Sequence, residues 1–290
     1  MAPYQIFTDA TADCSPQWLA SVPPVGIVPM QVEVGGKEYT YGPDGTISVR
    51  SFYDLQKAGN DTSTSQITPI QYFQSFEPAL QAGKDVLYLC FSSGMSGTFQ
   101  SAQVCAEELR EEYPDRHIIC LDTRCASVGE GGLVCEAAQR QAEGYTLEEL
   151  AKWVTQHCLE VCHWFTVDEF DHLRQGGRVS AGTAVVGTAL QIKPLLHVNQ
   201  NGELAVAEKP RGRKRAIEAQ LNKMEQGWLP EMGKNVVVGH GACPDGAQAL
   251  QEAIQKRFPE AKVFTADIGP IIGAHTGPGM LALIYWGNTR

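Results

Sequence analysis

Six residues, Ser92 to Gly97, of which all but Met95 are small, separate an apolar stretch from a helix-forming stretch in the segment LYLCFSSGMSGTFQSA. Glycines let the backbone come close to a ligand, and serines add hydroxyl donors. A helix that starts here offers free N–H groups and the positive end of its dipole. This combination is typical of a site for an oxyanion. A tight turn with serine caps explains the same local pattern equally well.

Two further corners of the first half have the same character. Residues 62–66, TSTSQ, form a hydroxyl cluster ahead of a helix, and DTRCASVGEGG follows the apolar segment HIICL. Ligands of open α/β sheets bind beyond the carboxyl ends of the strands, so we expect these corners at one sheet edge. In the second half, GAHTGPG places His275 in a mobile loop. There it can donate a hydrogen bond to a ligand or titrate near neutral pH, although a solvated loop histidine is the simpler alternative.

Common catalytic motifs do not account for the Ser92–Gly97 corner. The chain has no Gly-x-x-x-x-Gly-Lys-Ser/Thr loop, and the corner is not a Gly-x-Ser-x-Gly nucleophile elbow. A hydrolase triad remains an open alternative, with Ser93, His275 and either Asp122 or Asp9 as its members.

The segment QHCLEVCH brings two histidines and two cysteines close together, from His157 to His163. On a helix, Cys158 and Cys162 share a face, which is one geometry for zinc ligands. No second half-site follows, and free cysteine commonly packs as a small hydrophobe. We therefore expect core packing here and no metal.

Apolar stretches of strand length alternate with helical stretches in the first half. Strands are expected at YQIFTD, DVLYLCF and HIICLD, with a Gly-Gly hairpin in MQVEVGGKEYTY. This alternation is typical of parallel β-α-β units. After about residue 160, hairpins become more frequent, and PLLHVNQNGELAVAEKP predicts one around Asn201 and Gly202. We predict an α/β protein of two domains: a doubly wound, mostly parallel sheet over residues 1–160 and an α+β domain over residues 161–290.

Composition narrows the function classes. The formal net charge of −10 argues against nucleic acid as the main partner. No apolar run approaches the roughly 18 residues that span a bilayer, and the first residues lack a signal-peptide pattern. Nine cysteines without paired spacing suit a reducing compartment. We expect a cytoplasmic protein without a membrane span.

Seven segments, in order from residue 7 to about residue 284, together resemble the DegV family. They are FTDATADCS, TSQ, FSSGMSGTFQSA, DTRCASVGEGGL, DHLRQGGRVS, LQIKPLL and IGPIIGAHTGPGMLAL. The resemblance implies a two-domain α/β protein that binds a long-chain fatty acid between its domains. Some members are the acyl-carrying subunit of a bacterial fatty acid kinase. The partner kinase then phosphorylates the bound carboxylate, and the acyl phosphate enters phospholipid synthesis.

The resemblance also implies a set of site residues. Thr64 and Ser93 would donate hydroxyl hydrogen bonds to the carboxylate, which burial makes obligatory. Gly94 would donate its N–H, and His275 would reach the carboxylate from the second domain. Further candidates at this site are Ser65, Ser96 and Arg174. The resemblance implies no cofactor and no turnover by this subunit alone, and it leaves transient contact with a membrane open.

Two groups of basic residues have competing explanations. Arg174 would lie near the ligand or its lid in the family, but a helix end closed by Gly176 and Gly177 explains it equally well. The segment EKPRGRKRA concentrates positive charge on an acidic protein. A solvated face is one interpretation of this segment. The other is a docking patch for an acidic kinase subunit, formed by Arg211, Arg213 and Lys214.

One departure from the family pattern touches the threonine loop. The family sequence is Thr-Ser-Gln-Pro, whereas Ile67 follows Gln66 here and Pro69 comes two residues later. Because Thr64 keeps its place, we expect a changed loop shape and unchanged chemistry. A lipid-sensing or regulatory protein without a kinase partner stays open as an alternative, beside the acyl hydrolase.

Overall fold

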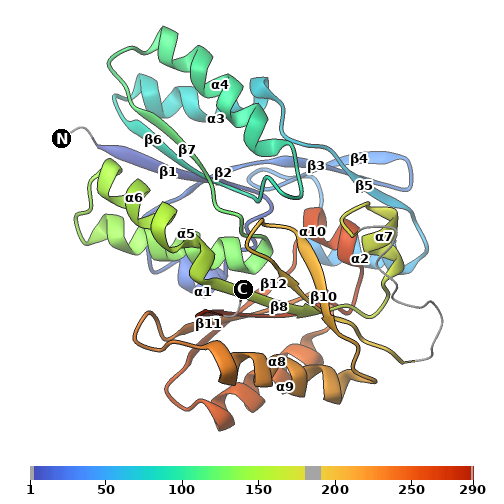
Figure 1. Ribbon diagram of the computed structural model, residues 1–290. Coiled ribbons are helices and arrows are strands. Elements are labelled where there is room, and N and C mark those ends of the chain that lie inside the picture. The colour runs from blue at the N-terminus through green and yellow to red at the C-terminus, as the bar shows by residue number, and fades with distance from the viewer. Residues whose placement is uncertain (1–2, 180–190, 289) are drawn as a thin grey trace.

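The computed structural model describes residues 3–179, 191–288 and 290, so Ser180 and Leu190 of the segments above lie outside the described residues (Figure 1). Its elements are stacked in layers. A pair of helices lies on a first sheet, further helices separate this sheet from a second large sheet, and another pair of helices covers the far side. The expected α/β fold with a parallel sheet in the first half is confirmed.

Sheet A is parallel throughout, with its strands in the order β2–β1–β6–β7. Every residue of β6 is buried, as expected of a central strand that is covered on both faces. Helices α3 and α4 cover one face, and α5 and α6 cover the other (Figure 1). The bounds are β1 Tyr4–Asp9, β2 Gly26–Val28, β6 Asp85–Cys90, β7 Ile118–Asp122, α3 Pro69–Gln81, α4 Thr98–Glu112, α5 Ser127–Ala142 and α6 Leu147–His157.

Sheet B is a small antiparallel sheet in the order β4–β3–β5. The predicted hairpin is confirmed: Gly35 and Gly36 join β3 to β4 with φ values of 60° and 76°, which only glycine adopts readily in such a turn. The bounds of this region are α1 Pro16–Leu19, β3 Met30–Val34, β4 Lys37–Tyr41, α2 Val49–Lys57 and β5 Thr62–Thr64.

Sheet C is a mixed sheet in the order β10–β9–β8–β13–β11–β12. Its one parallel pair among the described strands is β11 with β12. The predicted hairpin around Asn201 and Gly202 joins β9 to β10. The bounds are β8 Val161–Thr166, α7 Asp171–Gln175, β9 Leu195–Val198, β10 Leu204–Glu208, α8 Arg213–Gly227, β11 Asn235–His240, α9 Pro244–Arg257, β12 Lys262–Asp267, α10 Pro270–Thr276 and β13 Leu281–Trp286.

Strand β13 separates two hydrophobic cores, because alternate side chains of a strand face opposite sides. Ala282 and Ile284 belong to a large core that continues through α5 into sheet A. Leu281 and Leu283 belong to a second core with α8 and α9. All strands of sheets A and B precede residue 160, and all described strands of sheet C follow it. The division into domains at residue 160 stays a prediction, since the large core crosses that point.

The predicted mobile loop around His275 was wrong, and the helical pair of cysteines considered for zinc does not arise. Residues Pro270–Thr276 form helix α10 and not a mobile loop, because Pro270 occupies the first turn and Gly277, at φ 71°, ends the helix. Cys158 and Cys162 do not share a helix, because α6 ends at His157 and Cys162 lies on β8. Both cysteines are buried, Cys158 in the large core and Cys162 in the second core, as the expected core packing requires.

Candidate functional site

A cavity lies between the carboxyl edge of sheet A, the start of α5 and the inner face of sheet C. The space in which the centre of a water molecule can lie without overlapping protein atoms is about 210 Å³. Most of its wall is apolar, and sheet C contributes much of that wall. The apolar lining residues on and beside sheet C include Phe165, Val198, Leu204, Met280, Ala282 and Ile284.

One part of the cavity wall is rich in hydrogen-bonding groups. Thr64, the last residue of β5, is held in register by its pairing with Val32 of β3. Its Oγ1 lies 2.8 Å from Nε2 of His275, which α10 supplies from the other half of the chain. Ser96 and Gly97 line the wall at the N-terminus of α4, where the positive end of the helix dipole favours an anion. The N–H of Thr98, the first residue of α4, donates to Ser96 Oγ at 3.2 Å.

The imidazole of His275 is neutral at pH 7. Burial, together with the nearby Arg178 guanidinium, lowers the pKa of His275 to about 4. A neutral imidazole carries one N–H. In the tautomer with this proton on Nε2, His275 donates to Thr64 and leaves the threonine hydroxyl proton free for a ligand oxygen.

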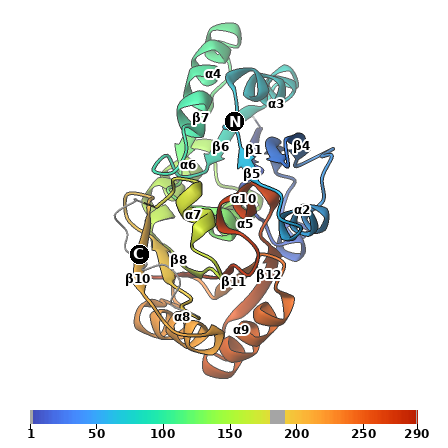
Figure 2. The same cartoon turned by 90° about the vertical axis from the view of Figure 1, so that its right-hand side faces the viewer.

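Helix α10 is inserted into the first half of the protein. Figure 2 shows it beside β5 and α7. Gln56 Nε2 donates to the carbonyl of Gly273 at 3.0 Å, and Thr62 Oγ1 donates to the carbonyl of Ala274 at 3.1 Å. These bonds satisfy carbonyls in the last turn of the helix. They fix the end of α10 that carries His275.

A second, more polar pocket of about 370 Å³ lies against the same residues. Thr64, His275 and Arg178 border both this pocket and the apolar cavity. Ser63 and His172 also line the polar pocket. The Thr64–His275 pair is therefore part of the wall between an apolar and a polar compartment.

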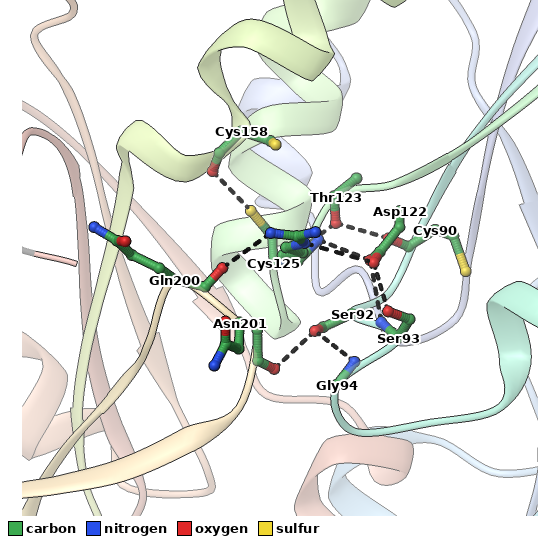
Figure 3. A network of polar contacts seen from close by, with 12 residues as sticks. Cys90, Ser92, Ser93, Gly94, Asp122, Thr123, Cys125, Cys158, Gln200 and Asn201 are labelled. Carbon is green, nitrogen blue, oxygen red and sulfur yellow. Dashed lines mark hydrogen bonds and ion pairs between the residues drawn. The ribbon is translucent and has the colours of Figure 1, made fainter.

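Ser93 and Gly94 are not among the residues that line either pocket. Ser93 Oγ donates to Asp122 Oδ2 at 2.5 Å, and its backbone N–H donates to Oδ1 at 3.1 Å (Figure 3). Gly94 is exposed, and a methyl group there would lie 2.7 Å from the carbonyl oxygen of Asn201. The structure thus brings Thr64 and His275 together but turns Ser93 toward sheet A.

The tip of the β9–β10 hairpin is clasped by loops of sheet A. Ser92 Oγ donates to the carbonyl of Gly202 at 2.7 Å, and Arg124 Nη1 donates to the carbonyl of Gln200 at 3.2 Å (Figure 3). Val198 and Leu204, on either side of this tip, line the cavity. The clasp therefore holds one wall of the cavity against the first half of the protein.

Exchanging Gly202 for alanine is expected to open this clasp. Its added methyl would overlap Ser92 Oγ, and φ is 78°. Gly36→Ala is the matched control, because its φ is 76° and no atom lies within 4 Å of the added methyl. Both variants should lose about 1 kcal/mol of unfolding free energy from the backbone, and Gly202→Ala about 1 kcal/mol more from the lost hydrogen bond. If urea unfolding showed that both variants lose the same free energy of unfolding, the stabilising role of the clasp would be contradicted.

The remaining predicted residues are divided between the cavity and the surface. Ser65 lines the cavity together with Ser96. Arg174 is 63% exposed and pairs with Asp171 at 3.0 Å on α7, so it lies at the helix end that the sequence also allowed. The hydrolase triad is not assembled, because His275 contacts Thr64 while Ser93 contacts Asp122 directly.

The basic segment is only partly free for a partner. Arg213 Nη2 lies 2.6 Å from Asp168 Oδ1 and 2.6 Å from the carbonyl oxygen of Gly279, the residue before the cavity-lining Met280, so its charge is already paired. Arg211 and Lys214 are exposed. Of the three residues expected to dock a partner, these two present their charge to solvent.

Sequence reasoning gave no site role to two cavity residues, Arg178 and His163. Arg178 directly follows the glycine turn at Gly177, whose φ of 70° reverses the chain after α7, and this turn was the available signal. His163 was considered only as part of the cysteine cluster. Its Nδ1–H donates to the Val161 carbonyl at 2.7 Å, and Nε2 accepts from the Ala126 N–H at 3.3 Å, as a neutral ring does.

Two buried acids share a hydroxyl beneath the cavity wall. Thr11, which lines the cavity, places Oγ1 2.5 Å from Asp9 Oδ1 and 2.9 Å from Glu130 Oε2. One hydroxyl donates only one proton, so one carboxyl group must supply the second. Burial, followed by the nearby Asp9, raises the pKa of Glu130 well above its usual range. Burial also raises the pKa of Asp9, but Asp9 accepts further hydrogen bonds from the Tyr88 hydroxyl and the Thr11 N–H, so the proton is assigned to Glu130.

Glu130→Gln is expected to become more stable relative to the wild type as pH rises. The raised pKa means that the folded wild type holds a proton that the unfolded chain releases above about pH 4.3. The stability from this proton is full below that pH and is lost as pH rises, by at most about 1.4 kcal/mol per pH unit. Glutamine keeps the same donor and acceptor without this loss. Urea unfolding between pH 5 and 9 measures this difference. If the free energies of unfolding of the two proteins changed equally with pH, the assignment would be contradicted.

Fold and cavity define an α/β protein with an internal, mostly apolar binding cavity. The chain belongs to the DegV family, since the model of that family, described as an uncharacterised protein, matches residues 3–288. A DegV domain-containing protein of Clostridium perfringens (strain 13 / Type A) is 36% identical over 290 residues, which are 100% of this chain and 99% of that protein.

Two solved structures resemble the fold over nearly the whole chain. A DegV family protein from Thermus thermophilus, described for its fatty acid binding, has a TM-score of 0.85 at 26% identity and covers 99% of this chain and 100% of its own. The Fatty Acid Kinase (Fak) B3 protein of Streptococcus pneumoniae, loaded with linoleic acid, has a TM-score of 0.85 at 20% identity, with the same coverage. At 20% identity, the likeness to the pneumococcal protein shows a shared fold.

Within residues 3–179, 191–288 and 290, no helix is long and apolar enough to cross a bilayer. The same residues contain no group of three or more His, Cys, Asp or Glu side chains placed to hold a metal ion.

Proposed function

We propose that the protein binds a long-chain fatty acid non-covalently and presents its carboxylate to a partner kinase. The observation that carries this proposal is the change of the cavity wall, from apolar side chains on sheet C to the paired Thr64 and His275. An amphiphile with a long tail and one small polar head matches such a wall. The fatty-acid-binding relative from Thermus thermophilus supports the same ligand class.

The tail supplies the affinity in this proposal. Each buried CH₂ contributes about 0.8 kcal/mol, so a chain of sixteen to eighteen carbons needs no covalent link to stay bound. The side chains on β8, β9, β10 and β13 form the apolar wall along which the tail lies.

The head group needs several donors, because an unpaired buried carboxylate is very costly. Thr64 donates its hydroxyl while His275 holds it in place, and Ser96 supplies a second hydroxyl from the same cavity wall at the start of α4. Arg178 adds positive charge nearby. In this proposal Ser93 and Gly94 shape the loop through Asp122 and the hairpin tip, and they do not contact the carboxylate.

The polar pocket gives a kinase access to the carboxylate. In phosphoryl transfer, a carboxylate oxygen attacks the γ-phosphorus of ATP held by the partner, and the bond to ADP breaks as the acyl phosphate forms. The pocket behind Thr64 and His275 offers that approach from outside. The exposed Arg211 and Lys214 are the proposed docking residues. The pneumococcal Fak B3 protein suggests a partner of this kind.

A coupled assay tests the proposal. The protein loaded with hexadecanoic acid is mixed with a fatty acid kinase catalytic subunit, ATP and hydroxylamine, which traps acyl phosphate as a hydroxamate. We expect hydroxamate only when both proteins are present, and less of it with Arg211→Glu/Lys214→Glu at unchanged lipid affinity. A protein that holds the acid but never yields hydroxamate would point to the regulatory alternative without a kinase.

A further inference from the structure

The carboxyl group of Asp13 joins two helices that flank the cavity. Asp13 lies in the loop after β1 and is only 6% exposed. Its Oδ2 accepts from Ser127 Oγ at 2.6 Å, at the start of α5. Its Oδ1 accepts from the backbone N–H of Gly269 at 2.8 Å, the residue that caps α10. A single side chain thus sets the spacing between α5 and α10.

The two partners of Asp13, Gly269 and Ser127, have little freedom to change their residue type or backbone conformation. A methyl group on Gly269 would lie 2.6 Å from Asp13 Oδ1 and 2.6 Å from the Tyr41 ring, so glycine is required for this approach. Ser127 has a φ of 52°, a left-handed conformation that is strained for a residue with a side chain. Strain of this kind persists where surrounding contacts fix it, and it clusters at binding sites. Ser127 also lines the cavity.

The other end of α10 is held separately, by Gln56 and Thr62. Asp13 holds Gly269, the N-cap of the helix, and these two side chains hold its last turn. His275 lies in that last turn and meets Thr64 across the same interface. The position of the imidazole therefore depends on both ends of a helix of only seven residues.

We propose that Asp13 is a positioning residue for the carboxylate site, which it serves by holding α10 so that His275 stays in hydrogen-bond contact with Thr64. This inference rests on the proposed fatty acid function. It adds a residue that is not itself among those lining the cavity. Its action passes through the Gly269 N–H and the helix.

The geometry does not require a charge on Asp13. Burial, and to a lesser degree the carboxylates of Asp267 and Asp9, raises the pKa of Asp13 to about 7, while the bonds from Ser127 and Gly269 oppose the shift. A protonated carboxyl keeps both contacts by donating to Ser127 Oγ. Asparagine has the same donor and acceptor pattern. Asp13→Asn therefore keeps the tie, and Asp13→Ala removes it.

The test compares affinities for hexadecanoic acid and hexadecan-1-ol, which share a tail and differ in the head group. We expect Asp13→Ala to lose about tenfold in its preference for the acid, because the Thr64–His275 contact is disturbed. Asp13→Asn and the control Asp267→Ala, at an exposed carboxyl two residues from the same helix cap, should keep the wild-type preference. His275→Ala combined with Asp13→Ala should match His275→Ala alone.

A different pattern of affinities would overturn the inference. An Asp13→Ala protein that keeps the acid preference, or that loses both ligands equally, shows a purely structural role. If Asp13→Ala does not fold, Gly269→Ala takes its place, because its methyl would overlap Asp13 Oδ1 and the Tyr41 ring, and neither residue lines the cavity. An unchanged acid preference in Gly269→Ala would likewise overturn the inference. A wild type with no affinity for the acid would instead refute the proposed function itself.

Discussion

Thr64→Val is expected to bind hexadecanoic acid about 10- to 100-fold more weakly than the wild type, with almost unchanged affinity for hexadecan-1-ol. Valine keeps the shape of threonine but removes the hydroxyl that lies 2.8 Å from His275 Nε2. A hydrogen bond to a charged group contributes about 1.5–3 kcal/mol, which corresponds to this range. Isothermal titration of both ligands measures the effect.

The matched control is Thr155→Val. The hydroxyl of Thr155 donates to the Ala151 carbonyl within α6, and neither residue lines the cavity. This variant should bind both ligands as the wild type does. If Thr64→Val lost acid and alcohol equally, or neither, Thr64 would not contact the head group and the carboxylate would have to be placed elsewhere.

Ala282→Phe is expected to shift ligand preference from long to short acyl chains. Ala282 lies on β13 with its side chain in the cavity wall. A phenyl ring there takes the space of about three methylenes, each contributing about 0.8 kcal/mol. Affinity for octadecanoic acid should fall about 50-fold relative to dodecanoic acid. Competition between the two acids for one preparation reports this ratio directly.

Leu283→Phe is the control for overpacking. Leu283 follows on the same strand but faces the core with α8 and α9. We expect it to lower the free energy of unfolding by about 1–3 kcal/mol without changing the chain-length profile. If Ala282→Phe lost affinity for both acids equally, as general destabilisation would cause, the tail would not lie along β13.

Local signals in the sequence predicted much of the fold. The strand before Phe91 and the helix from Thr98 follow from an apolar run, a small-residue turn and a helical stretch. Both hairpins follow from their glycines, because Gly36 and Gly202 adopt positive φ values that the turns require. Such features depend on neighbours within a few residues, so the sequence displays them directly.

Contacts between distant segments were harder to predict. The partner of Ser93 is Asp122, on the next strand of sheet A, and this contact turns the hydroxyl away from the cavity. His275 lies on a helix because that helix is held by Gln56 and Thr62 of the first half. The Thr64–His275 pair itself was expected only through the family resemblance, since no local pattern links residues so far apart.

Native mass spectrometry of the purified protein, followed by lipid analysis after mild denaturation, tests the central claim most directly. We predict one added mass per chain, equal to a free long-chain fatty acid, and much less of it on Thr64→Val than on Thr155→Val. A wild-type protein that stays empty after incubation with fatty acids would contradict the account.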